Sequence, residues 1–262
     1  MNKLLKSILS VVGMSLALMG CTGDFDDMNT DPNNPTPGSV DPKFQLIYIQ
    51  ARGIPYANQW QQIDQLMIST MCEYSANDGL SASDYNIDSR YVDDIWNMSY
   101  TLLTNANSLI RANESNPIHN NAVQMARIWK AYVMLRLTNC IGDIPYSEAA
   151  NNIDQPKYDT QKDIYYTIFG ELTDAVNKLD AAATNNIGTF DLIYGGDAAK
   201  WKKFANSIRL RMAVRISNVD AGKAKTEAQA AIAAGVFESD ADAAFMTQGE
   251  DKFSQNPIYY HK

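Results

Sequence analysis

The stretch from Asn77 to Tyr91 holds the residue types in this 262-residue chain that best suit binding of a small ligand. Carboxylates and amides hydrogen-bond to hydroxyl groups, and flat aromatic rings pack against apolar C–H faces, so a sugar would satisfy both kinds of residue. The alternative is an ordinary solvated loop whose tyrosines pack onto the body of the protein. The sequence predicts ligand contacts from these residues of the stretch: Asp78, Asp84, Tyr85, Asn86 and Tyr91.

The same stretch opens like a calcium-binding loop, because Asp84, Asn86 and Asp88 alternate along it. An EF-hand also needs glycine at its sixth position and glutamate at its twelfth, where this chain has Ser89 and Ile95. An EF-hand is therefore excluded, and a looser calcium site stays open. With only two histidines in the chain, a histidine-rich metal site is unsupported, and we expect no cofactor.

Residue patterns that would indicate catalysis are missing. The adjacent pairs Asp26-Asp27 and Asp93-Asp94 diverge on a helix or an extended chain, so neither pair can flank a glycosidic bond from both sides. No serine lies in a G-x-S-x-G context, and no phosphate-binding P-loop is present. Gly195-Gly196-Asp197 is interpreted as a tight turn whose aspartate caps the next helix. We therefore expect that the protein is not an enzyme. The rival hypothesis is a surface enzyme such as a glycosidase.

Three arginines, Arg209, Arg211 and Arg215, lie within one segment of helical pattern. Arg211 and Arg215 are one helical turn apart, whereas Arg209 is displaced around the axis. We interpret them as solvated or paired charges whose aliphatic stems cover apolar surface. A clamp for a carboxylate is the functional alternative.

Helices must position these residues, because apolar side chains recur at steps of three and four from about Phe44 onward, without a convincing alternating strand. Thr160 with Asp163 resembles a capping box, Asp197 is an expected N-cap, and Gly235 is an expected helix stop. The pattern predicts five helices and a shorter alanine-rich sixth: Ala57–Tyr74, Val92–Ala112, Asn120–Asn139, Gln161–Ala182, Ala198–Ser217 and Lys223–Ala234.

The segment 120–139 carries two adjacent apolar stripes, which predicts a helix buried between other helices. Helix pairs in series are typical of a TPR-like stack, although the strict 34-residue TPR repeat is absent. The predicted fold is therefore all-α, built of irregular TPR-like helix pairs around one core.

Residues 1–20 have the pattern of a signal peptide. Two lysines precede an apolar run that is shorter than the roughly 20 residues a membrane span needs. Leu18 and Gly20 then precede Cys21 as in a lipobox, so we predict cleavage before Cys21 and lipidation of its sulfur. An ordinary secretory signal cut elsewhere is the alternative.

Residues 21–43 are rich in proline, asparagine and aspartate, which predicts an extended tether before a helical domain at residues 44–262. Loss of residues 1–20 would remove two lysines and no acid, so the formal net charge would pass from −8 to −10. Such an acidic body lacks the basic footprint that nucleic acid requires. We interpret Cys72 and Cys140 as small buried hydrophobic residues, with a disulfide between them as the alternative.

Several segments resemble signatures of the SusD/RagB family of outer-membrane nutrient-binding lipoproteins. The opening from Cys21 to Asn33 is similar to the mature start of such lipoproteins. Leu135–Ala149 resembles the family's "R-L…x-G-D-I-P-Y-x-E-A" signature. Asp191–Asp197 with Trp201–Arg211 resembles "D-x-x-Y-x-G-D…W-x-x-x-x-N-S-L-R-L-R", and Trp96 fits the family's "W…A-N-x-L-I" helix.

This resemblance implies an all-helical scaffold with TPR-like helix pairs, and a lipid anchor at the outer face of a Gram-negative outer membrane. It implies a SusC-like TonB-dependent transporter as partner, and glycans or sometimes peptides as ligands. The acids Asp24, Asp26 and Asp27 resemble a surface-export signal. The chain resembles the N-terminal part of such a protein, and its abrupt end at Lys262 suggests a fragment of something longer.

We therefore predict a surface nutrient-binding lipoprotein that grips an oligosaccharide reversibly and delivers it to the transporter. A TPR-like protein–protein interaction lipoprotein without sugar affinity is one alternative, and a peptide-binding uptake protein of the RagB type is another.

Overall fold

The computed structural model describes residues 40–53, 89–151, 153–183 and 187–246. The chain divides into two units, Met1–Val40 and Asp41–Lys262, and the helices below belong to the second. This part of the chain contains no β-strand, which confirms the all-α prediction. Its six α-helices are α3 (Pro42–Gly53), α5 (Ser89–Asn113), α6 (Asn120–Ile141), α7 (Gln161–Lys178), α8 (Ala198–Arg215) and α9 (Ala221–Ala234).

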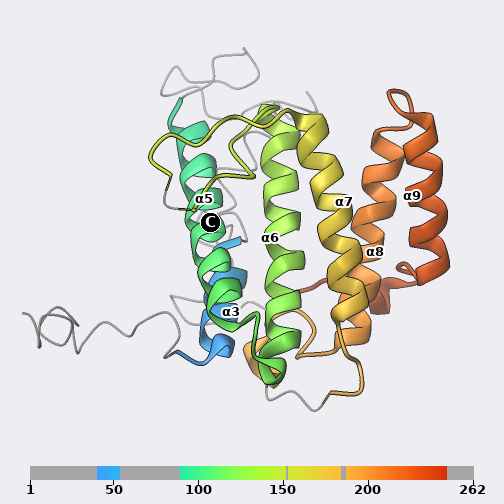
Figure 1. Cartoon of the computed structure of the whole chain (residues 1–262). Helices are drawn as coiled ribbons and strands as arrows, with labels where there is room; N and C mark the ends of the chain where they lie inside the picture. The colour runs from blue at the N-terminus through green and yellow to red at the C-terminus, as the bar shows by residue number, and fades with distance from the viewer. Residues whose placement is uncertain (1–39, 54–88, 152, 184–186, 247–262) are drawn as a thin grey trace, which may run out of the picture. The chain divides into compact units, whose positions relative to one another are not determined.

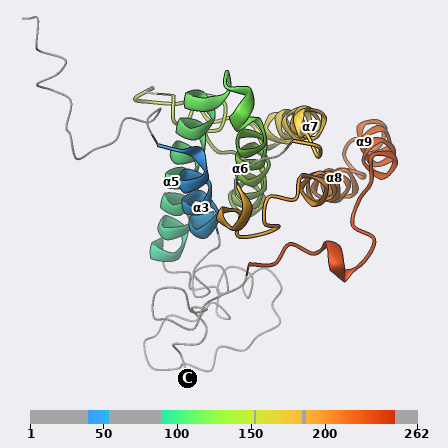
Figure 2. The same ribbon diagram turned by 90° about the horizontal axis from the view of Figure 1, so that it is seen from below.

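From α5 to α9, each helix packs against the next one in the chain and runs in the opposite direction (Figure 1). Helix α3 packs against both α5 and α6, as the view from below shows (Figure 2). The series of antiparallel neighbours is the TPR-like arrangement that the sequence predicts. Within the described residues, every helix is too short or too polar to cross a membrane.

Helix α6 is the central element, because α5 and α3 cover one side of it and α7 covers another. Most of its side chains are buried, including Met125, Ile128, Met134 and Leu137 with no exposed surface. This wide burial matches the two adjacent apolar stripes of its sequence, because a helix enclosed by neighbours needs apolar residues on most of its faces.

Helix ends follow the predicted capping residues. The Thr160 hydroxyl accepts a hydrogen bond from the Asp163 amide at 3.1 Å and donates one to the Asp163 carboxylate at 2.7 Å. The Asp197 carboxylate accepts from the second and third amides of α8 at 2.9 and 3.1 Å. Gly235 ends α9 with a φ of 93°, a conformation that favours glycine.

Some helix bounds differ from the predicted ones. Helix α3 begins at Pro42, so the last two residues of the expected tether are helical. Helix α7 ends at Lys178 instead of Ala182, because Asn121 holds both backbone groups of Asp180 in an extended segment: the Asn121 amide donates to the Asp180 carbonyl at 2.8 Å and accepts from its amide at 2.9 Å. The predicted helix Ala57–Tyr74 lies outside the described residues.

The buried carboxylate of Asp191 connects α3 to α8. Oδ1 accepts hydrogen bonds from the Gln50 amide at 2.9 Å and from the Ile193 backbone at 3.1 Å. Oδ2 accepts from the Trp201 indole at 2.7 Å and from the Gly196 backbone at 2.8 Å. The glycine-rich turn before α8 is thus a structural element, as the sequence interpretation has it.

The three arginines of α8 separate into two environments. Arg209 is buried and pairs with the carboxylate of Glu227 on α9 at 2.8 Å, whereas Arg211 and Arg215 are exposed. Paired and solvated charges are both confirmed, but Arg209 is enclosed between helices instead of lying over the surface. Cys140 is half-buried against the core, and Cys72 lies outside the described residues.

Candidate functional site

The segment between α6 and α7 forms a long loop. It begins at Gly142, which hydrogen bonds with Thr138 hold in place. Gly142 ends α6 with a φ of 93°, and its amide donates to the Thr138 carbonyl at 2.8 Å. The Thr138 hydroxyl donates to the Gly142 carbonyl at 2.6 Å. A positive φ permits the sharp change of direction here, and a side chain at this position would strain the backbone.

Asp159 holds the two ends of this loop together. Its carboxylate accepts hydrogen bonds from the Tyr146 amide at 2.9 Å, the Ser147 amide at 2.7 Å and the Ser147 hydroxyl at 2.8 Å. The backbones of Asp159 and Ile144 also form an isolated antiparallel bridge. Burial by itself would raise the pKa of Asp159, but the hydrogen bonds from Ser147 and Tyr146 lower it below its ordinary value. Asp159 therefore ties the residues near the start of the loop to its end.

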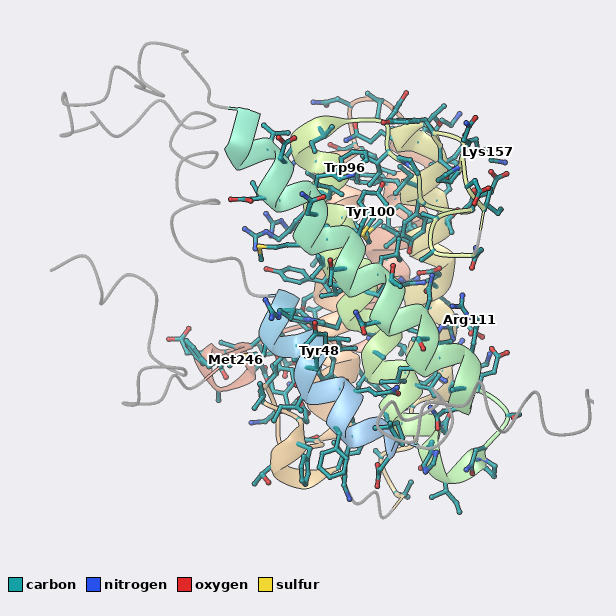
Figure 3. The ribbon with its side chains drawn as sticks, turned by 90° about the vertical axis from the view of Figure 1, so that its left-hand side faces the viewer. Tyr48, Trp96, Tyr100, Arg111, Lys157 and Met246 are labelled. Atoms are coloured by element: carbon teal, nitrogen blue, oxygen red, sulfur yellow. The ribbon has the colours of Figure 1, made fainter. Side chains whose placement is uncertain are left out.

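The fixed loop lies along one side of α5. The Tyr100 hydroxyl donates to the Pro145 carbonyl at 2.7 Å. Further along the helix, Arg111 donates to the Ala150 carbonyl at 3.0 Å and to the Asn151 side chain at 3.1 Å. Figure 3 shows Trp96, Tyr100 and Arg111 in succession along α5, with Lys157 on the loop beside them.

At the first half of α5, three rings form what we call the aromatic surface: Trp96, Tyr100 and Tyr158. The ring centroids of Trp96 and Tyr100 lie 4.7 Å apart, and those of Trp96 and Tyr158 lie 6.3 Å apart with planes at 32°. Tyr158 is 63% exposed, so its ring is open to a ligand. Beside it, Lys157 pairs with Glu148 at 3.3 Å. An exposed ring that packs beside a second ring suits the flat face of a sugar.

Further along the same side, a cavity of about 320 Å³ opens between α5, α6, α7 and the loop; we call it the polar cavity. The Tyr146 hydroxyl donates to Glu171 at 2.7 Å, and Lys130 pairs with the same carboxylate at 3.1 Å. Burial and the nearby Glu171 charge raise the pKa of Tyr146, so its hydroxyl stays a donor. Asn107, Arg111, Ser147 and Asn151 also line the cavity.

The aromatic surface and the polar cavity together offer stacking and many hydrogen-bond donors and acceptors. A ligand with apolar faces and hydroxyl groups needs this combination, and reversible recognition needs nothing more. No group of three or more histidine, cysteine or acidic residues within the described part of the chain is placed to hold a metal ion.

The predicted site residues Asp78, Asp84, Tyr85 and Asn86 lie outside the described residues, as does Cys21. Tyr91 falls in the first turn of α5, so the predicted loop leads directly into the helix that carries the aromatic surface. The sequence interpretation missed Tyr158, because a single tyrosine in a polar loop gives no signal of what it packs against.

A model of the SusD-like family, described as "Starch-binding associating with outer membrane", matches residues 40–262. A solved SusD homologue from Parabacteroides distasonis is 31% identical with a TM-score of 0.74, over 84% of this chain and 44% of that one. A solved chitin-binding protein is 32% identical with a TM-score of 0.71, over 84% and 48%. A chitin-binding SusD homologue from Flavobacterium johnsoniae is 27% identical with a TM-score of 0.67, over 82% and 47%.

The chain spans less than half the length of these solved structures. No curated protein matches it significantly.

Proposed function

Because this chain belongs to the SusD-like family, we propose that it is a surface lipoprotein that binds glycans at the outer membrane. The observation that carries the proposal is the exposed ring of Tyr158, held against Trp96 beside a polar cavity of about 320 Å³. Starch-binding is the description of the family, and two of the similar structures are described as chitin-binding. Glucose-based and N-acetylglucosamine-based oligosaccharides are therefore the first ligands to test.

In this proposal a glycan lies with one sugar face on Tyr158 and Trp96, and its hydroxyls reach the polar groups of the neighbouring cavity. Affinity comes from stacking and hydrogen bonds, without covalent chemistry. Lipidation at Cys21 would anchor the protein in the outer membrane, and the ligand would pass to a SusC-like TonB-dependent transporter. The expected contacts of the loop before α5, Asp78 to Tyr91, belong to the same proposal, because that loop leads into the aromatic surface.

The test is isothermal titration of the full chain with maltoheptaose and chitohexaose, using wild type, Tyr158→Ala and Tyr48→Ala. Tyr48 is the matched control, since it is an exposed tyrosine on α3 that lies apart from the aromatic surface (Figure 3). Loss of one aromatic contact of about 0.5–1.5 kcal/mol weakens binding about 2- to 10-fold. We expect this for Tyr158→Ala and no change for Tyr48→Ala.

A Tyr85→Ala variant tests the contribution of the loop before α5. If this variant binds the glycans with the affinity of wild type, Tyr85 and its loop do not belong to the site. Equal affinities of Tyr158→Ala and wild type would exclude the aromatic surface. Binding of peptides without any glycan would favour the RagB-type alternative. Association with a transporter without ligand affinity would favour the protein–protein adaptor.

A further inference from the structure

A second cavity, of about 360 Å³, lies where the first turn of α7 meets the last turn of α8 and the segment that leads to α9. We call it the α7–α8 cavity. The tyrosines Tyr165 and Tyr166 and the cations Lys162 and Arg215 line it. None of its lining residues belongs to the aromatic surface or to the polar cavity.

The cations at this cavity form no ion pair, and the same holds for a few exposed cations elsewhere in the described part of the chain, such as Arg52 and Lys225; what sets them apart is their place at a cavity. Lys130, Lys203, Arg209 and others each form an ion pair with an acid. In the described part of the chain, no ion pair joins an acid to Lys162, to Arg215 or to Arg211 one turn earlier on α8. All three side chains are exposed. On a chain of formal net charge −8, the lining of this cavity holds two cations, Lys162 and Arg215, against one acid, Asp220.

Asp220 is the one acid among the residues that line the cavity, and its carboxylate is already engaged. One oxygen accepts a hydrogen bond from the Tyr166 hydroxyl, and the other accepts from the Lys223 amide at 2.9 Å as the N-cap of α9. The hydrogen bonds from Tyr166 and Lys223 lower the pKa of Asp220, and the nearby charges of Lys162 and Lys223 lower it further. Its position is thus fixed by the structure, and it forms no ion pair with Lys162 or Arg215.

The charges of Arg211 and Arg215 influence Tyr165, which lines the cavity. Tyr165 is buried, and its hydroxyl donates to the Asn139 side chain at 2.5 Å, which fixes the ring. Burial raises the pKa of Tyr165, while the charges of Arg215 and Arg211 act in the opposite direction.

We propose that the α7–α8 cavity binds a carboxylate of an acidic oligosaccharide, with Arg215 as the principal contact and Lys162 and Arg211 adding positive charge. A guanidinium group binds a carboxylate through two parallel hydrogen bonds, and the tyrosine walls provide faces for a sugar ring. The choice of a saccharide rests on the proposed function. The choice of a carboxylate rests on the two cations that line the cavity without an ion pair. A carboxylate clamp is also the functional alternative that the sequence leaves open for the arginines of α8.

The experiment titrates the full chain at low ionic strength with trigalacturonate and with its methyl ester, which has the same length and no charge. The variants are Arg215→Gln and Lys162→Gln, with Arg52→Gln as the matched control because Arg52 is an exposed arginine on α3, away from this cavity. We expect wild type to prefer the acid over the ester. Loss of a charge-assisted contact weakens binding of the acid about 10-fold or more, and added salt weakens binding of the acid to wild type.

Equal affinity of wild type for the acid and the ester would overturn the inference, as would unchanged binding of the acid by Arg215→Gln. Binding of an acidic peptide in place of the uronate would overturn it too. In each of these cases binding of maltoheptaose or chitohexaose at the aromatic surface would still support the proposed function. Absence of any oligosaccharide binding would overturn both. Melting curves of the variants identify a fold defect, which substitution of exposed side chains should not cause.

Discussion

Replacing Asp191 with asparagine tests the buried network that links α3 to α8 through hydrogen bonds. The carboxylate accepts four hydrogen bonds, two at each oxygen, from Gln50, Ile193, Gly196 and Trp201. Asparagine keeps one acceptor oxygen and turns the other into an amino group. Whichever way the amide is oriented, its amino group faces two donors, so two hydrogen bonds are lost, and one buried side-chain donor and one half-buried backbone amide stay without a partner.

The magnitude follows from these lost bonds. Hydrogen bonds to a charged group contribute about 1.5–3 kcal/mol each, so two of them amount to about 3–6 kcal/mol. Removal of the buried charge relieves part of its desolvation cost, which places the expected loss near the lower end, at about 3 kcal/mol. In a domain of this size such a loss lowers the melting temperature by about 6–12 °C.

The assay is urea unfolding of wild type and Asp191→Asn, followed by tryptophan fluorescence, since Trp201 donates directly to Asp191. Asp197→Asn is the matched control: it is the same substitution six residues further on, at an exposed N-cap where asparagine caps as well as aspartate. We expect the control to stay within about 0.5 kcal/mol of wild type. A loss below about 1 kcal/mol for Asp191→Asn would refute the reasoning that the hydrogen bonds of Asp191 stabilise this part of the fold.

Three further predictions concern backbone packing, acid sensitivity and the anchor. Gly53→Ala should lower the free energy of unfolding in urea by about 1–3 kcal/mol, because a Cβ there would overlap the indole of Trp129. The control is Gly222→Ala on α9, where a Cβ meets only an ordinary contact. It should be neutral or stabilising by up to about 1 kcal/mol. Since the pKa of Asp159 is lowered in the folded state, its contribution to stability is present above the unfolded pKa of about 4 and is lost as pH falls through the folded value; urea midpoints of Asp159→Asn should therefore fall less steeply with acid than those of wild type. Cys21→Ala should move the protein from the membrane fraction to the soluble fraction in cell fractionation, and continued retention would contradict a lipid anchor.

Helix positions could be predicted from the sequence because their signals are local. Thr160 and Asp163, Asp197, and Gly235 cap or end helices as predicted, since each cap involves residues a few positions apart. The end of α7 could not be predicted, because Asn121 on another helix decides it. Helix α3 was missed as a separate element.

The candidate site was less predictable than the scaffold. The sequence singled out the loop from Asn77 to Tyr91 by its composition, and that expectation stays a prediction. The aromatic surface was not foreseen, because Trp96 and Tyr158 come from different elements and meet only when the loop between α6 and α7 folds back along α5. Similarly, the sequence grouped Arg209 with Arg211 and Arg215. Only the packing of α8 against α9 shows that Arg209 forms an ion pair with Glu227.

By itself the sequence determined an all-α chain of paired helices, the caps that end them and the segments that resemble SusD-like proteins. These features depend on side-chain periodicity and on hydrogen bonds between near neighbours in the chain, which each segment carries independently of the rest. Only the tertiary structure decided which rings share a surface, which cations in the described part of the chain pair with an acid, and where cavities open. Those properties depend on contacts between residues far apart in sequence, and such contacts exist only once the helices have packed.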